Sequence, residues 1–196
     1  MNVTAVQDER GPRKPKLLTA MITERFFSST NNHTAYETVA HVFLFTIKQV
    51  RYNSGFGLLN RQSQNKILGQ QWAAVLSFRL AYWTSNMDHV LPYLQTTIKH
   101  FQELKLDINE REFFENTILC RKDVLVDDLK ESALAEVLQE KAVDGLYAKN
   151  LMDKKRFLKI LLSISVLYNC SSECLYSHLF KPIIGEVSME SIIATI

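Results

Sequence analysis

The sequence predicts an all-α fold. Apolar residues recur at spacings of three and four through most of the 196-residue chain, which is the pattern of helices that bury one face. The one segment with a candidate strand pattern is a short hairpin near residues 83–87. Hydrophobic residues make up 46% of the chain, which is enough for a single domain with a large core.

Residues 1–16 differ from the rest of the chain. They lack apolar periodicity, and Gly11, Pro12 and Pro15 interrupt any helix. The basic side chains of this segment are Arg10, Arg13, Lys14 and Lys16. We therefore divide the chain into a basic arm, residues 1–16, and a helical domain, residues 17–196.

The helical domain begins with three predicted helices. A short helix is expected over Leu17–Phe27, and a second over Tyr36–Tyr52, where Asn53-Ser54-Gly55 ends it. The third spans Gln62–Trp83. Its second half carries a single charge, Arg79, so we expect it to be the central helix of the domain.

Residues that cap helix N-termini predict four further helices. Asp and Asn side chains accept hydrogen bonds from the first free N–H groups of a helix. The predicted caps are Asp88, Asn109 with Glu112 as a capping box, Asp127 or Asp128, and Asp153. A helical pattern resumes over Ser172–Phe180, where Pro182 is expected to stop it, and Gly185 precedes a last short helix, Ser188–Ile196.

Residues able to carry catalysis or bind a metal are scattered. His41 lies in an apolar helix, where a core or groove histidine is expected. The three cysteines form neither an even disulfide framework nor a paired zinc motif, and reduced thiols are expected: Cys120, Cys170 and Cys174. Three glutamates of one helix are expected to form a solvated face: Glu110, Glu112 and Glu115. There is no Gly-rich phosphate loop and no nucleophile turn, so we expect no enzyme activity, cofactor or metal in this chain.

Residues 51–72 resemble the signature of the nuclear-receptor ligand-binding domain. That signature reads as a basic residue, Phe, Leu, Asp-Gln, Leu-Leu and Trp. The residues at those places here are Arg51, Phe56, Leu59, Ser63-Gln64, Ile67-Leu68 and Trp72, with Ser63 in place of the usual Asp. Ala5–Arg13 is similar to the extension that follows the second zinc finger in many nuclear receptors. The Ile-Lys at Ile47, the Ala-x-Trp of Ala81–Trp83 and the Leu-x-Leu-Asp of Leu104–Asp107 resemble the tailless-type orphan receptors within this family.

The resemblance implies that residues 17–196 form a three-layer antiparallel helical sandwich. It implies the regulatory domain of a nuclear, DNA-binding transcriptional repressor, in which the arm follows the DNA backbone. Zinc is then expected in an upstream DNA-binding domain that this chain does not contain. The implied partners are a co-repressor helix of the atrophin type, DNA through the zinc fingers, and a second copy of the chain. No membrane partner is expected, because the sequence shows no signal peptide, membrane span or lipidation motif.

The resemblance also implies a surface groove for a partner's short amphipathic helix. Its wall residues are Leu44, Ile47, Gln64 and Leu68, and Arg51 lies at one end. A bound helix leaves unpaired carbonyls at its C-terminus, which a cation such as Arg51 can cap. The alternative is that Arg51 is a solvent-exposed arginine at a helix end, with no role in binding.

The last helix departs from the pattern of activating receptors. There, a glutamate follows two apolar residues and supplies the anionic cap for a coactivator helix, whereas Thr195 occupies that place here. The apolar positions are Ile192, Ile193 and Ile196. We therefore expect weak coactivator binding and a last helix that packs into its own groove between Ile47 and Leu68. The alternative is a frayed C-terminus whose isoleucines cover the core.

Two other functions remain open. The first is a ligand-activated receptor with a lipophilic ligand in its core, which bulky side chains would exclude if they filled that space. The candidate side chains are Phe43, Phe45, Trp72, Phe78 and Trp83. The second is a helical interaction domain unrelated to receptors.

Overall fold

The computed structural model of the chain describes residues 33–83, 94–169 and 171–196. These ranges are mostly helical and contain no strand, so the all-α prediction is confirmed for them. The helices are α2 (His33–Val50), α3 (Arg61–Ala81), α4 (Gln95–Leu104), α5 (Ile108–Leu119), α6 (Leu129–Lys149), α7 (Lys154–Leu162), α8 (Ile164–Leu167), α9 (Ser172–Leu175), α10 (Lys181–Ile184) and α11 (Met189–Thr195). Two 3-10 turns, η1 (Phe56–Leu58) and η3 (Lys122–Val124), and a π-helical turn, η4 (Tyr176–Phe180), complete the order.

Several predictions concern residues outside these ranges. They are the basic arm with Arg10, Arg13, Lys14 and Lys16, the helix over 17–27, residues 84–87 of the hairpin, and the cap at Asp88.

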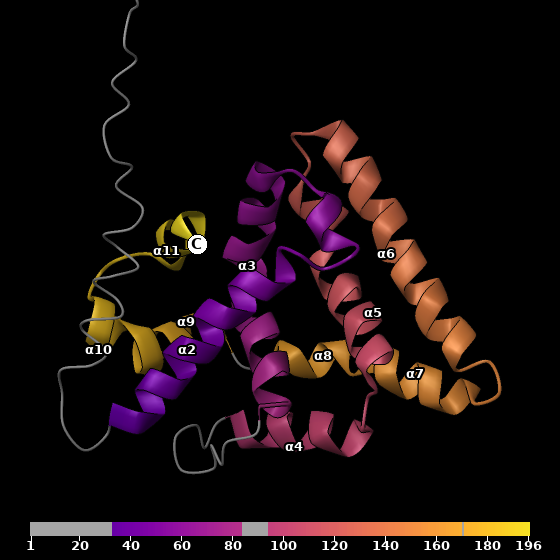
Figure 1. Cartoon of the computed structure of the whole chain (residues 1–196), viewed down its shortest axis with the longest axis horizontal. Helices are drawn as coiled ribbons and strands as arrows, with labels where there is room; N and C mark the ends of the chain where they lie inside the picture. Colours follow the sequence, from indigo (N-terminus) through magenta and orange to yellow (C-terminus); the bar gives the residue numbers. More distant parts are fainter. Residues whose placement is uncertain (1–32, 84–93, 170) are drawn as a thin grey trace, which may run out of the picture.

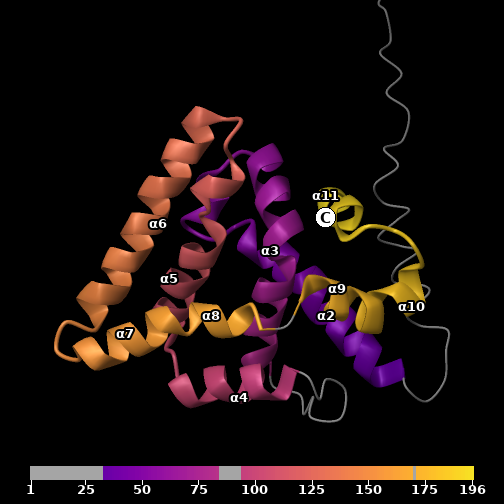
Figure 2. The ribbon, with the colours of Figure 1, turned by 180° about the vertical axis from the view of Figure 1, so that it is seen from behind.

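Helix α3 is the centre of the fold, as its sequence predicts. Fourteen of its residues are buried, and α2, α4, α5 and α11 all pack against it. In Figure 1, α2 crosses in front of α3, while α5 and α6 lie to one side. Figure 2 shows the opposite face, which α7 and α8 cross on the other side of α3 and α5.

Aromatic side chains fill the interior between α2, α3 and η4. Phe43, Trp72 and Phe180 pack edge to face in a triangle whose ring centroids are 5.1, 5.5 and 6.0 Å apart. Phe78 packs with two further buried rings near α4 and α5. Of the five bulky residues considered, Phe43, Trp72 and Phe78 are buried, whereas Phe45 and Trp83 contact each other nearer the surface.

The caps at Asp128 and Asp153 are confirmed, but the capping box of α5 lies two residues earlier than predicted. Asp107 accepts hydrogen bonds from the N–H groups of Asn109 and Glu110, and the Glu110 carboxylate accepts from the N–H of Asp107. The two candidate pairs, 107/110 and 109/112, have the same spacing, so sequence alone did not separate them.

The prediction that Glu110 and Glu115 lie on a solvated face is wrong, because both are 3% exposed. Glu110 accepts hydrogen bonds from Arg156 at 2.7 Å and Asn150 at 3.1 Å. Glu115 pairs with Arg79 through two hydrogen bonds, one of them 2.7 Å long. Glu110 and Glu115 therefore each have a cation from another helix, which offsets the cost of burying their charge.

The C-terminal helices end differently from the prediction. Pro182 lies in the first turn of α10, where a backbone N–H is not needed for helical hydrogen bonds. It therefore does not end the helical segment. The stop is Gly185, whose φ of 68° lies in the left-handed region that favours glycine. The helix that Asp153 caps ends at Leu162, and Ser163 separates it from α8.

The Glu110–Arg156 pair yields a test of stability. Burial favours the neutral form of Glu110, but hydrogen bonds from Arg156, Asp107 and Asn150 outweigh it and hold the pKa of this carboxyl below its usual range. We expect Arg156→Ala to lower the free energy of unfolding by about 2–3 kcal/mol at pH 7, measured by urea titration, because a buried carboxylate loses its cation.

The pH dependence follows from the direction of the shift. A lowered folded pKa gives stability that is complete above the unfolded value of about 4.3 and is lost as the pH falls through the folded value. The difference between the unsubstituted protein and Arg156→Ala should therefore shrink between about pH 5 and pH 3. The neighbouring exposed lysine provides the control, Lys155→Ala. An equal loss for both variants would show that the ion pair contributes nothing.

Candidate helix-binding groove

Arg51 follows the last residue of α2 and is buried, at 7% exposure. Its guanidinium donates three hydrogen bonds from its terminal nitrogens. Nη1 donates to Gln64 Oε1 at 3.2 Å, and Nη2 donates to Asn65 Oδ1 at 2.8 Å and to the carbonyl oxygen of Ile193 at 2.8 Å. Arg51 therefore joins the end of α2 to α3 and to the C-terminal half of α11.

The turn between α2 and α3 positions these groups. The Gln64 amide donates to the carbonyl oxygens of Phe56 and Leu59, which leaves its own oxygen to accept from Arg51. The Phe56 N–H donates to Asn116 of α5 at 2.9 Å. A side chain at Gly57 would come within 2.9 Å of the Arg51 carbonyl oxygen, so glycine permits the close return of the chain at this point.

Helix α11 is seated against α3 (Figure 1). Ser188 caps it by accepting from the N–H of Ser191, and Ile192 and Ile193 are buried at 2% and 0% exposure. At Gly69 of α3, a Cβ would lie 3.0 Å from Cγ of Glu190, so the two helices approach closely where α3 lacks a side chain. The isoleucines are buried as both expectations require, and α11 is helical as far as Thr195.

The electrostatics of Arg51 are unusual. Burial, together with the nearby charge of Arg61, lowers the pKa of the Arg51 guanidinium to about 10. Its acceptors are two amides and a backbone carbonyl, all neutral. Its Nε is buried and has no hydrogen-bond partner. Among the residues that the structure describes, no carboxylate pairs with this cation.

The structure joins two of the predicted groove residues, Arg51 and Gln64, and buries or half-buries the others. Arg51, Gln64 and Ile193 are linked directly, while Ile47 and Leu68 are completely buried and Leu44 is half-buried. Thr195 is half-buried and donates its hydroxyl hydrogen to the Ile192 carbonyl oxygen rather than to a group beyond α11.

Two groove residues were not predicted from the sequence. Asn65 could have been found because it follows Gln64 on the first turn of α3. The importance of Gly69 could not, because it depends on where α11 lies. His41, expected in the core or the groove, is instead exposed and packs its ring against Trp83 at 6.2 Å.

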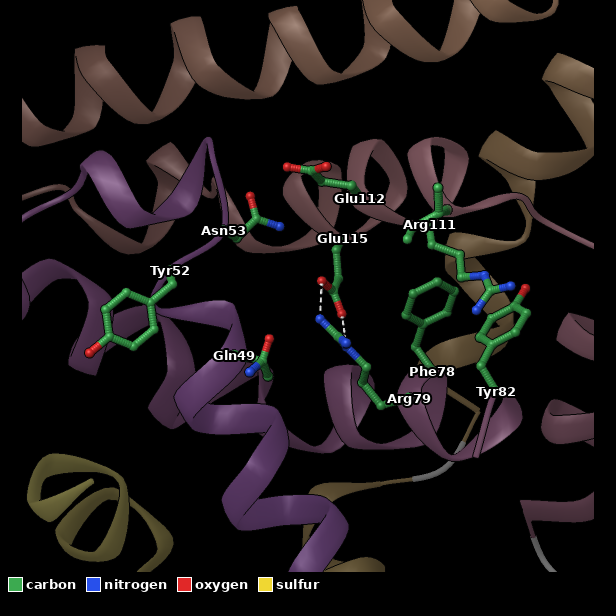
Figure 3. Close-up of a pocket in the computed structure, with 10 residues that line it drawn as sticks. Gln49, Tyr52, Asn53, Phe78, Arg79, Tyr82, Arg111, Glu112 and Glu115 are labelled. Carbon is green, nitrogen blue, oxygen red and sulfur yellow. Dashed lines mark hydrogen bonds and ion pairs between the residues drawn. The ribbon is translucent and has the colours of Figure 1, made fainter. Parts of the chain in front are cut away.

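A second concave site lies between the ends of α2 and α3 and helix α5. This pocket of about 360 Å³ contains the Arg79–Glu115 ion pair, and Arg111 stacks over the Tyr82 ring at 4.2 Å (Figure 3). Burial raises the pKa of Glu115, although Arg79 opposes the shift. Each of these charged groups is engaged with a neighbour, so the geometry indicates a structural role for them.

A third hollow, of about 310 Å³, borders α11. Trp72 and Met189 supply its apolar surface, and three carboxylates line it: Glu173, Glu186 and Glu190.

Within the described ranges, no group of three or more side chains is arranged to hold a metal ion. In the same ranges, no single helix is long and apolar enough to span a membrane, although the bent pair Lys154–Leu167 and Ser172–Ile184 would be by length and composition alone.

Comparison with protein-family models and with curated proteins finds no match for this chain.

Proposed function

We propose that the chain is the regulatory domain of an orphan nuclear receptor that represses transcription, and that α11 acts as an internal occupant of its co-regulator groove. The hydrogen bond from Arg51 to the Ile193 carbonyl carries this proposal. It is the contact expected between the cation at the end of the groove and the C-terminus of a bound helix, made here by the chain's own last helix.

The arrangement of the helices agrees with a three-layer sandwich. Helix α2 lies on one side of α3 and α5, and α7 and α8 lie on the other (Figures 1 and 2). The upstream zinc-finger domain, nuclear localisation and DNA contacts by the arm remain part of the proposal on the resemblance alone.

Packing of α11 in the groove opposes the binding of coactivator helices. Burial of each isoleucine side chain stabilises the seated state by about 1.5–3 kcal/mol, and any helix that uses the same site must displace it. A co-repressor helix that binds in this way therefore needs contacts that α11 does not make. Mass action then favours whichever helix interacts better with the groove.

A lipophilic ligand in the core is the alternative function. The triangle of Phe43, Trp72 and Phe180 occupies the interior between α2, α3 and η4. Because filled interior space leaves less room for a ligand, this packing favours regulation by helix exchange over ligand binding.

The groove proposal predicts a gain of peptide binding when α11 is weakened. Ile193→Ala removes about 2–5 kcal/mol from the seated state, so co-repressor helical peptides should bind at least about tenfold more tightly than to the intact chain. Adding Thr195→Glu should then favour Leu-x-x-Leu-Leu peptides, because it restores an anionic cap. Fluorescence anisotropy measures both.

An exposed isoleucine on α5 gives the matched control for this experiment, Ile108→Ala. Peptide affinity should not change in this variant. If Ile193→Ala keeps its melting temperature and binds peptides no better than the intact chain, α11 does not occupy the groove.

Self-association is the second part of the proposal. Leu158 and Leu162 lie one turn apart on α7 and are 53% and 71% exposed. Met152, in the turn before α7, is fully exposed. Exposed apolar side chains on one helix face suit a twofold interface. Lysines flank them at 154, 155 and 159, so two copies also repel each other at low salt.

We therefore expect a dimer at micromolar concentration that strengthens with added salt, measured by light scattering. Replacing both leucines, Leu158→Gln with Leu162→Gln, should give a monomer. Leu129→Gln, an 83% exposed leucine on α6, should remain dimeric. A monomer at every salt concentration for the unsubstituted chain would contradict the proposal.

A further inference from the structure

Among the described residues, Arg51 has no anionic partner while α11 is seated. A buried guanidinium gives up its hydration, and neutral acceptors restore only part of the lost interaction. Arg51 nevertheless makes all of its hydrogen bonds to neutral oxygens, and its Nε makes none. The charge of Arg61 nearby adds repulsion. The seated state therefore contains a cation for which α11 supplies no counter-ion.

The one acidic side chain of α11 is far from Arg51. Glu190 lies in the first turn of α11, against Gly69, whereas Arg51 contacts the carbonyl of Ile193 near the other end. The hydroxyl of Thr195 is already used by the Ile192 carbonyl.

The Nε of Arg51, which has no hydrogen-bond partner, also indicates the geometry of a group that would bind the guanidinium more strongly than α11 does. In a guanidinium, Nε–H and one Nη2–H point in parallel from one edge, which a carboxylate can accept with both oxygens. Nη2 now donates to Ile193, whose carbonyl would leave with α11. Departure of α11 therefore frees one Nη2–H of a guanidinium whose Nε–H has no partner. A carboxylate can accept from both groups where the freed hydrogen lies on the Nε edge.

We propose that the groove selects a partner helix with an aspartate or glutamate immediately after its last turn, and that this carboxylate pairs side-on with Arg51 and displaces α11. The proposal rests on the function proposed above and adds the chemistry of the partner. The acidic residue must lie just past the helix, because a carboxylate within the last turn is disfavoured by the helix dipole.

Paired peptides test this proposal on the full chain. Both are the same leucine-rich amphipathic helix with an amidated C-terminus, and they differ in one residue after the last turn, Asp or Asn. The C-terminal amide removes the terminal carboxylate, which could otherwise pair with Arg51 in both peptides. We expect the Asp peptide to bind about tenfold more tightly than the Asn peptide, because a charge-assisted bidentate pair replaces neutral hydrogen bonds.

Variants of Arg51 test whether its guanidinium causes the preference for the Asp peptide over the Asn peptide. Arg51→Lys keeps the charge but loses the side-on pair of donors, so the preference should fall to about twofold to threefold. Arg51→Gln should abolish it. Lys48→Gln removes an exposed charge of α2 and should leave the preference unchanged. Thermal melting of each variant shows that the fold is retained.

The outcomes separate the two proposals. Equal binding of the Asp and Asn peptides overturns the partner chemistry but leaves helix exchange in place. A preference that survives in Arg51→Gln also overturns it, because another cation must then be responsible. If neither peptide binds, even to Ile193→Ala, then the proposed groove function and this inference both fail.

Discussion

One interaction joins α11 to the end of α2, the hydrogen bond between the buried guanidinium of Arg51 and the carbonyl of Ile193. It links residues 142 positions apart in the chain. The turn around η1 holds Arg51 in place through Gln64, and α3 supplies the surface on which α11 lies. A cation at a helix C-terminus is favourable, but a buried cation without an anion is costly, and the seated state has both properties. Under the proposed function, that balance allows α11 to be held in the groove and also to be exchanged for a partner helix.

Buried ion pairs hold the rest of the fold. Glu110 with Arg156 and Glu115 with Arg79 connect α5 to α7 and α3, and each carboxylate is almost fully buried. In contrast to Arg51, these arginines have carboxylate partners. Among the residues that the structure describes, the carboxylates of Glu110 and Glu115 therefore have a cation, whereas the guanidinium of Arg51 has only neutral acceptors.

The sequence was a good guide to local structure. Helical spacing identified α2 and α3, and side-chain caps located the starts of α6 and α7 at Asp128 and Asp153. It failed where the outcome depended on distant residues. Burial of Glu110 depends on Arg156, 46 positions away, and the close approach at Gly69 depends on α11. The resemblance pointed to Arg51 and the last helix, whereas the missing counter-ion could be recognised only from the complete set of contacts around the guanidinium.

Hydrogen exchange of residues 188–196 tests the central claim most directly. The N–H groups of Ile192 and Ile196 are bonded within α11, to Ser188 and Ile193. In the free chain we expect this segment to be protected to a degree similar to the start of α3, which lies beneath it. Saturating helical peptide should remove the protection from α11 while leaving α3 protected. Rapid exchange of residues 188–196 in the free chain, or protection that is unchanged when peptide is bound, would contradict an exchangeable helix seated in the groove.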